Sequence, residues 1–214
     1  MRTKFLSMVL VCTLCLSMAV PATAAALPSD LETAAAYVRE RGIMAGDQNG
    51  NLNLDAGLNR AELAVLLTRL RGGLEELYAN TGYYEQGCKF TDVPAWAKLF
   101  VGYCVRNNLV AGYDALRYGA ADPVNPAAAC TVILRVCGVE DGEGSVWNYD
   151  TACSYAVSLG WIDESTAQAD IITRGEMAVL IYRAQTGARP GVPPSTGDGF
   201  LSNGKPVTEE NVLE

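Results

Sequence analysis

The chain of 214 residues carries 24 acidic against 16 basic side chains, which gives a net charge of −8 at neutral pH. Nucleic acid is a poor candidate partner, because phosphate binding needs a basic face. The chain also lacks histidine, which excludes Ser-His-Asp and Cys-His catalysis and the usual histidine-ligated zinc sites. A carboxylate-pair hydrolase stays formally open, but no spacing singles out a pair. We expect a non-enzymatic protein without cofactor or metal.

The N-terminus has the pattern of a secretory signal peptide. Arg2 and Lys4 precede an almost wholly apolar run over residues 5–19, and PATAAA (21–26) places small residues at A-x-A spacing. The apolar run is shorter than the roughly 20 residues that a membrane-spanning helix needs. We therefore expect residues 1–26 to be removed on export, with no membrane insertion afterwards.

Three segments align as the end of a similar helix: YVRERGIMAG (37–46), YCVRNNLVAG (103–112) and YAVSLGWIDE (155–164). In each, a Gly or Asn precedes an apolar residue, which is typical of a helix C-terminus. Upstream, small or apolar residues recur four positions apart, on one helical face: Ala34 and Val38, Phe100 and Cys104, Ala152 and Ala156. Each unit is predicted to begin with a helix that buries this stripe.

A second helix is predicted after a loop in each unit: NRAELAVLLTRLRG (59–72), NPAAACTVILRVCG (125–138) and TRGEMAVLIYRAQT (173–186) align without gaps. Each begins with a favourable N-cap, and Glu62 and Glu176 complete capping boxes in the first and third. Pro126 occupies the first helical position of the second, which proline favours. An arginine recurs near each C-terminus, where the helix dipole favours a cation: Arg69, Arg135 and Arg183.

These helix pairs define three units of about 45 residues, over 30–72, 90–138 and 144–187. A two-helix unit cannot bury both faces alone, so the three units should pack together. The expected fold class is mainly α. Residues 188–214 read as a Pro/Gly linker and a C-terminal tail.

Two arginines stand where local helix chemistry does not explain them. Arg60 and Arg174 lie in the first helical turn, where a cation opposes the helix dipole by about 0.3–1 kcal/mol. Two interpretations are open. Each arginine pairs with its capping-box glutamate, or the arginines and the helix N-terminal N–H groups together face an anionic ligand.

Five cysteines follow the signal peptide: Cys88, Cys104, Cys130, Cys137 and Cys153. An odd number at irregular spacing is a weak disulfide signal. Cys104, Cys130 and Cys153 take apolar helix positions, which favours buried thiols. Cys88, in a polar loop, is expected to be the most exposed, and one bridge stays open.

The segment FTDVPAWAKLFVGYCVRNNLVAG (90–112), followed by a loop and an N-R-A-E or T-R-G-E helix start, resembles the S-layer homology repeat. That family's pattern is an F-x-D-V…W-A opening, a G-I-x-x-G centre and a T-R-A-E helix start, usually in three tandem copies. The resemblance covers about residues 30–187. It implies a pseudo-threefold α-helical prism on the outside of a Gram-positive cell wall. Such prisms bind a secondary cell-wall polysaccharide, often pyruvylated, without covalent linkage.

The resemblance also implies that the polymer binds in grooves between repeats. Carried over by motif, the lining residues are Arg60, Arg174, Asp92, Trp96, Gly46 and Gly112. No repeat is complete: the first lacks the Asp-Val and Trp signature, and the second has Pro126 in place of the arginine. In the third, Trp147 is a candidate substitute for the missing tryptophan. The alternative is a degenerate structural or adaptor module that makes protein–protein contacts at the cell surface without binding glycan. The tail could join an effector domain or dock a partner protein.

Overall fold

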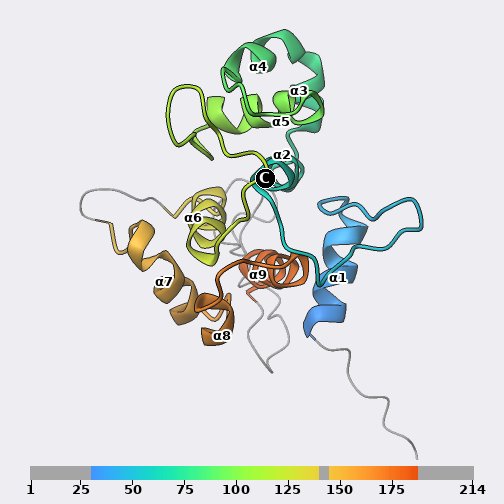
Figure 1. Cartoon of the computed structure of the whole chain (residues 1–214). Coiled ribbons are helices and arrows are strands. Elements are labelled where there is room, and N and C mark those ends of the chain that lie inside the picture. Colours follow the sequence, from blue (N-terminus) through green and yellow to red (C-terminus); the bar gives the residue numbers. More distant parts are fainter. Residues whose placement is uncertain (1–29, 140–144, 188–214) are drawn as a thin grey trace, which may run out of the picture.

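A computed structural model describes residues 30–139 and 145–187 (Figure 1). These residues form nine α-helices and one short 3-10 helix, without strands. The helices are α1 (Asp30–Glu40), α2 (Arg60–Leu70), α3 (Leu74–Ala79), α4 (Thr81–Gly87), α5 (Ala95–Arg106), α6 (Pro126–Val136), η1 (Tyr149–Thr151), α7 (Ala152–Ser158), α8 (Glu164–Ala167) and α9 (Arg174–Thr186). In this part of the chain no helix has the length and apolar character needed to cross a membrane. The expected signal peptide and tail lie outside the described residues.

The first helix of each predicted unit ends in the same way. Gly42, Asn108 and Gly160, just past α1, α5 and α7, have φ of 65°, 56° and 73°. The amide of the next residue donates back to a carbonyl five positions earlier, at 2.9 Å in all three units. This is the Schellman closure that a left-handed residue permits. The prediction of three equivalent helix ends is confirmed.

The second helices, α2, α6 and α9, begin as their caps predict. The Asn59 and Thr173 side chains accept from the amides of Glu62 and Glu176, and both capping boxes are complete. Asn125 caps α6, with Pro126 at the first helical position. Apolar residues at aligned positions of the three helices are buried, among them Leu63, Ala129 and Met177. Local chemistry therefore sets where these helices begin and which face they bury.

The first helix of each predicted unit packs on the second helix of a different unit. Helix α5 packs on α2, α7 packs on α6, and α1 packs on α9. In Figure 1, α2, α6 and α9 lie near the centre, with the other helices around them. The order of contacts is cyclic, because the first helix of the described residues packs on the last. The pseudo-threefold prism itself stays a prediction.

A ring of three backbone hydrogen bonds joins the starts of the central helices. The amide of Leu58 donates to the carbonyl of Ile172 at 3.1 Å, that of Ile172 to Val124 at 2.9 Å, and that of Val124 to Leu58 at 2.8 Å. Each of these residues immediately precedes a helix N-cap and is buried. The ring therefore ties α2, α6 and α9 together at the same end.

Two stretches form more helix than the sequence indicates. Residues 73–89, left between the first two predicted units, form α3 and α4, which pack on α5. At the contact, a Cβ on Gly102 would lie 1.8 Å from the carbonyl oxygen of Tyr84, so only glycine allows the approach. The short loop of the third unit carries α8.

Candidate functional site

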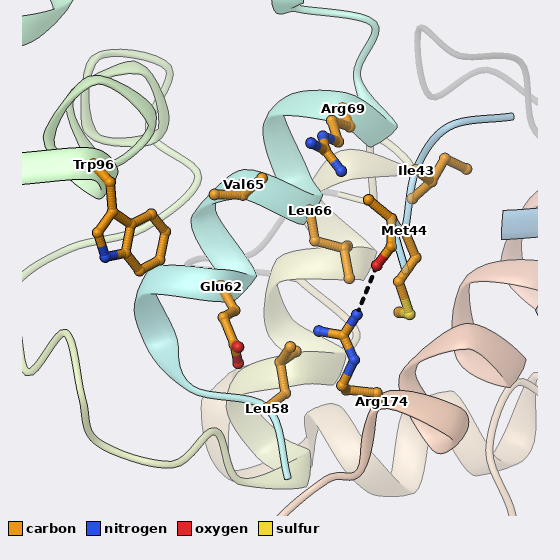
Figure 2. Close-up of a pocket in the computed structure, with 10 residues that line it drawn as sticks. Ile43, Met44, Leu58, Glu62, Val65, Leu66, Arg69, Trp96 and Arg174 are labelled. Carbon is orange, nitrogen blue, oxygen red and sulfur yellow. Dashed lines mark hydrogen bonds between the residues drawn. The ribbon is translucent and has the colours of Figure 1, made fainter. Parts of the chain in front are cut away.

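A cavity of about 260 Å³ lies against α2 and is called the first groove here. Trp96, at the start of α5, and Arg174, at the start of α9, both border it. In the view of Figure 2 they stand on either side of Glu62. Other lining residues come from one stripe of α2 and from the loop after α1: Val65, Leu66 and Arg69, then Ile43, Met44 and Ala45. Segments of all three predicted units therefore contribute to this groove.

An equivalent cavity of about 150 Å³, the second groove, lies against α6. Arg60 takes the place of Arg174, Arg135 that of Arg69, and Tyr149 borders the cavity as Trp96 does in the first groove. The stripe of α6 and the loop after α5 complete the lining: Ala128, Thr131 and Val132, then Leu109, Val110 and Ala111. The two grooves thus share one pattern of two arginines and one aromatic ring.

A third groove, of about 380 Å³, lies against α9 and departs from that pattern. Its arginine is Arg183, whose guanidinium is buried and lies 2.8 Å from an oxygen of Asp30 and 3.2 Å from one of Asp163. Leu31 stands at its border in place of an aromatic ring. At the helix position equivalent to Arg60 and Arg174, α6 has Pro126, so this groove has no second cation. The positive charge of Arg183 is therefore neutralised within the protein.

Arg60 and Arg174 donate hydrogen bonds to carbonyl oxygens of another predicted unit. Arg60 Nε donates to Tyr118 at 2.9 Å and Nη2 to Ala111 at 2.8 Å. Arg174 Nε donates to Leu52 at 2.7 Å, and its Nη2 donates to Ala45 at 3.2 Å, the bond drawn in Figure 2. Neither guanidinium forms an ion pair with a glutamate in residues 30–139 and 145–187. The pairing interpretation is therefore wrong, and the two charges bind loop carbonyls.

The backbone N–H groups at these helix starts are also occupied. The amides of Arg60 and Ala61 donate to the carbonyls of Asp122 and Ala120, at 3.1 and 3.0 Å. Those of Arg174 and Gly175 donate to loop carbonyls of the first unit at 2.8 Å each. The next amide of each helix donates to the N-cap side chain. An anion site built on these N–H groups is therefore ruled out, because protein oxygens already fill it.

Asp92 lies beside a separate cavity that Trp96 also borders. Its carboxylate accepts from the amides of Tyr118 at 2.8 Å and Gly119 at 2.6 Å. These bonds, that of Tyr118 above all, hold the pKa of Asp92 below its ordinary value. Asp92 thereby holds in place the loop whose Tyr118 carbonyl accepts a hydrogen bond from Arg60.

Gly46 and Gly112 are required by close packing. A Cβ on Gly46 would lie 2.5 Å from the backbone of Gly50, and one on Gly112 would lie 2.3 Å from the ring of Phe90. Neither glycine is among the residues that line the three grooves. Each directly follows the alanine whose carbonyl accepts an arginine.

No family model matches the chain. Two curated proteins of bacterial surfaces are similar to it. The middle cell wall protein of Brevibacillus brevis is 28% identical over 171 residues, which is 76% of this chain and 15% of that protein. The surface layer protein of Brevibacillus choshinensis is 30% identical over 128 residues, 58% of this chain and 11% of that protein. The chain is a distant relative of both. It spans only a small fraction of their length.

The sequence analysis did not assign two residues that line the grooves. Arg69 and Arg135 line the first and second grooves, although their recurrence has a sufficient local explanation in the helix dipole. The guanidinium of Arg69 makes no side-chain hydrogen bond or ion pair within the described residues. The recurrence of an arginine at one position of three aligned helices was the signal that could have indicated the groove role of Arg69 and Arg135.

The aromatic residue of the second groove was also assigned wrongly. Trp147 is buried in the core, 2% exposed, and does not substitute for the missing tryptophan. Tyr149, two residues later, is half-exposed and lines the groove. Its hydroxyl accepts a hydrogen bond from the side-chain nitrogen Nδ2 of Asn125 at 3.2 Å. The 3-10 helix η1 begins at Tyr149 after the Asn148 cap, so the Tyr149 side chain does not follow Trp147 into the core.

Proposed function

We propose that the chain is an S-layer homology domain that anchors itself to the bacterial cell wall by binding an anionic polysaccharide in the first and second grooves. The observation that carries the proposal is the first groove, where two arginines and an exposed indole surround one cavity. Guanidinium groups bind carboxylates with two parallel hydrogen bonds. A largely apolar pocket with a few placed polar groups is the usual form of a ligand site.

The two arginines of the first groove have different roles in this proposal. Arg174 uses two donors on loop carbonyls, so its main role is to hold the groove wall in place while adding positive charge. Arg69 can bind an acidic substituent without giving up a bond to the described part of the chain. Trp96, which is 56% exposed, provides a flat apolar face for a sugar ring.

The names of the two relatives support a role at the cell wall or surface, and this function needs neither catalysis nor a cofactor. The chain's net negative charge requires attraction to an acidic polymer to be local, as two arginines in one cavity would provide. The third groove is left out of the proposal. Its arginine is already paired with Asp30 and Asp163.

The second candidate function is a structural or adaptor module that contacts other proteins without binding glycan. It is favoured by the carbonyl partners of Arg60 and Arg174, because those hydrogen bonds give both residues a purely structural purpose. The two functions differ in what the first groove must bind. Only the anchoring function requires Arg69 and Trp96.

The test is pelleting of the purified protein with host cell walls, comparing Arg69→Gln and Trp96→Ala with wild type. We expect each substitution to weaken binding about tenfold, which corresponds to about 1.4 kcal/mol. Arg71→Gln and Tyr78→Ala are the matched controls, because they change an exposed arginine and an exposed tyrosine that line none of the three grooves. Unchanged binding by both groove variants would favour the adaptor function.

A further inference from the structure

The second groove contains a buried hydroxyl group that has no hydrogen-bond partner. Thr131 lies in α6, lines this groove and is 5% exposed. Within the described residues, its Oγ1 neither donates nor accepts a hydrogen bond. A hydroxyl in this state destabilises the fold, because it has given up hydrogen bonds to water and gained none in return. The position of this oxygen therefore needs an explanation other than stability.

A second buried threonine shows that a helix can satisfy such a hydroxyl by itself. Thr68 in α2 donates a hydrogen bond from its Oγ1 to the carbonyl of Ala64, one turn earlier, at 2.9 Å. This is the usual local bond of a threonine inside a helix. Thr131 has Ala127 one turn earlier in α6, but it does not form the equivalent bond.

The hydroxyl distinguishes the second groove from the other two. In α2 and α9 the position aligned with Thr131 is held by Val65 and Val179, and each of these valines lines its own groove. Valine and threonine are both branched at Cβ. The two valines show that the groove wall can be built at this position without an oxygen atom.

We propose that the Thr131 hydroxyl donates a hydrogen bond to the acidic group of the ligand that the second groove binds. The inference rests on the proposed function, because it needs an anionic ligand in this groove. Arg135 lies four residues later on the same face of α6 and lines the same cavity. A hydroxyl and a guanidinium that are neighbours in this way can each donate to one oxygen of a carboxylate.

Burial of Thr131 in the ligand-free groove is compatible with this role. A threonine in a helix can occupy two side-chain rotamers, so its hydroxyl can turn toward a ligand at the cavity wall without movement of the backbone. The hydrogen bond to the ligand would then supply the partner that the free protein lacks.

The first and second grooves should therefore differ in selectivity. Next to its arginine, the second groove offers a hydroxyl, whereas the first offers the methyl groups of Val65 beside Arg69. A ligand that places an apolar group against Thr131 leaves the hydroxyl unpaired and is disfavoured. An oxygen acceptor at the same place is favoured.

The first measurement is thermal unfolding of the full chain without ligand. We expect Thr131→Val to raise the Tm by about 2–4 °C, because it removes an unpaired buried hydroxyl. The matched control is Thr68→Val, which removes a hydroxyl that is hydrogen-bonded and lines none of the three grooves. It should lower the Tm. A fall in the Tm of Thr131→Val like that of the control would overturn the inference.

The second measurement is pelleting with purified host cell walls in a Trp96→Ala background, which weakens the first groove. We expect addition of Thr131→Val to reduce the remaining binding about tenfold, and addition of Thr131→Ser, which keeps the hydroxyl, to leave it near its starting value. Addition of Thr68→Val should also leave it unchanged.

The outcomes separate this inference from the proposed function. If wild type binds the walls but Thr131→Val leaves the binding of Trp96→Ala unchanged, the role of Thr131 is overturned and the anchoring function stands. If wild type does not bind the walls, the anchoring function and the role of Thr131 are overturned together.

Discussion

At the scale of single residues, the positions of Arg60 and Arg174 in the first helical turn are explained by hydrogen-bond acceptors far away in the sequence. Each guanidinium lies between loop carbonyls of a neighbouring unit, and Arg60 also lies 4.8 Å from the centroid of the Tyr113 ring and 4.6 Å from that of Tyr118. The unfavourable helix-dipole term, about 0.3–1 kcal/mol, is smaller than the gain from two charge-assisted hydrogen bonds. These arginines therefore stabilise the packing of units whether or not a ligand is bound.

Substitution of Arg60 by Ala should lower the free energy of unfolding by about 2 kcal/mol, because two carbonyl oxygens lose a charged donor. Arg60→Lys should be intermediate, since an ammonium group cannot reproduce the planar spacing of two guanidinium donors. Urea unfolding followed by circular dichroism measures both. A wild-type midpoint for Arg60→Ala would show that these hydrogen bonds contribute nothing to stability.

At the scale of helices, one buried cation lies where the cyclic packing closes. Arg183 on α9 is 3% exposed and reaches Asp30 on α1, joining the first and last helices of the described chain. The two aspartates that it contacts are about half-exposed, so water can solvate them when the arginine is removed. The cost of breaking the cluster should therefore fall below that of a fully buried ion pair.

We expect Arg183→Ala to destabilise the protein by about 2–3 kcal/mol, through lost packing as well as lost charge. Asp30→Asn should have a smaller effect, since Asp163 still pairs with the cation. Differential scanning calorimetry, with Arg71→Ala as an exposed control, measures the difference. If Arg183→Ala melted with the control, the α1–α9 contact would not depend on this cluster.

Helix starts and ends were predictable from the sequence because they depend on neighbours within five residues. Asn59 and Thr173 cap their helices, and Gly42 and Gly160 close theirs, by bonds that the local sequence specifies. Helices α3 and α4 were missed. Neither helix has a side-chain hydrogen bond at its N-cap, and both pack on α5.

The grooves were only partly predictable, because their walls come from distant segments. The acceptors of Arg174 lie 122 and 129 residues away, and no local pattern indicates them. The resemblance to a known repeat supplied Trp96 and Arg174, which do meet at one cavity. It did not supply Arg69 or Tyr149, and it could not show that Gly46 and Gly112 are required by packing.

At the scale of the whole molecule, the three predicted units form grooves of different charge. The first and second grooves keep two arginines each, and the third has its single arginine buried between aspartates. We therefore propose a cell-wall anchor with two binding grooves, in which cyclic packing of the units forms the binding surface. Its central claim is that the wall polymer is the ligand.

The most direct test of that claim is cosedimentation of the secreted protein with purified host cell walls, before and after acid extraction of the secondary polymer. The account predicts that the protein pellets with untreated walls and remains in the supernatant with extracted ones. Binding that survives extraction would contradict the account, and so would a failure to bind untreated walls.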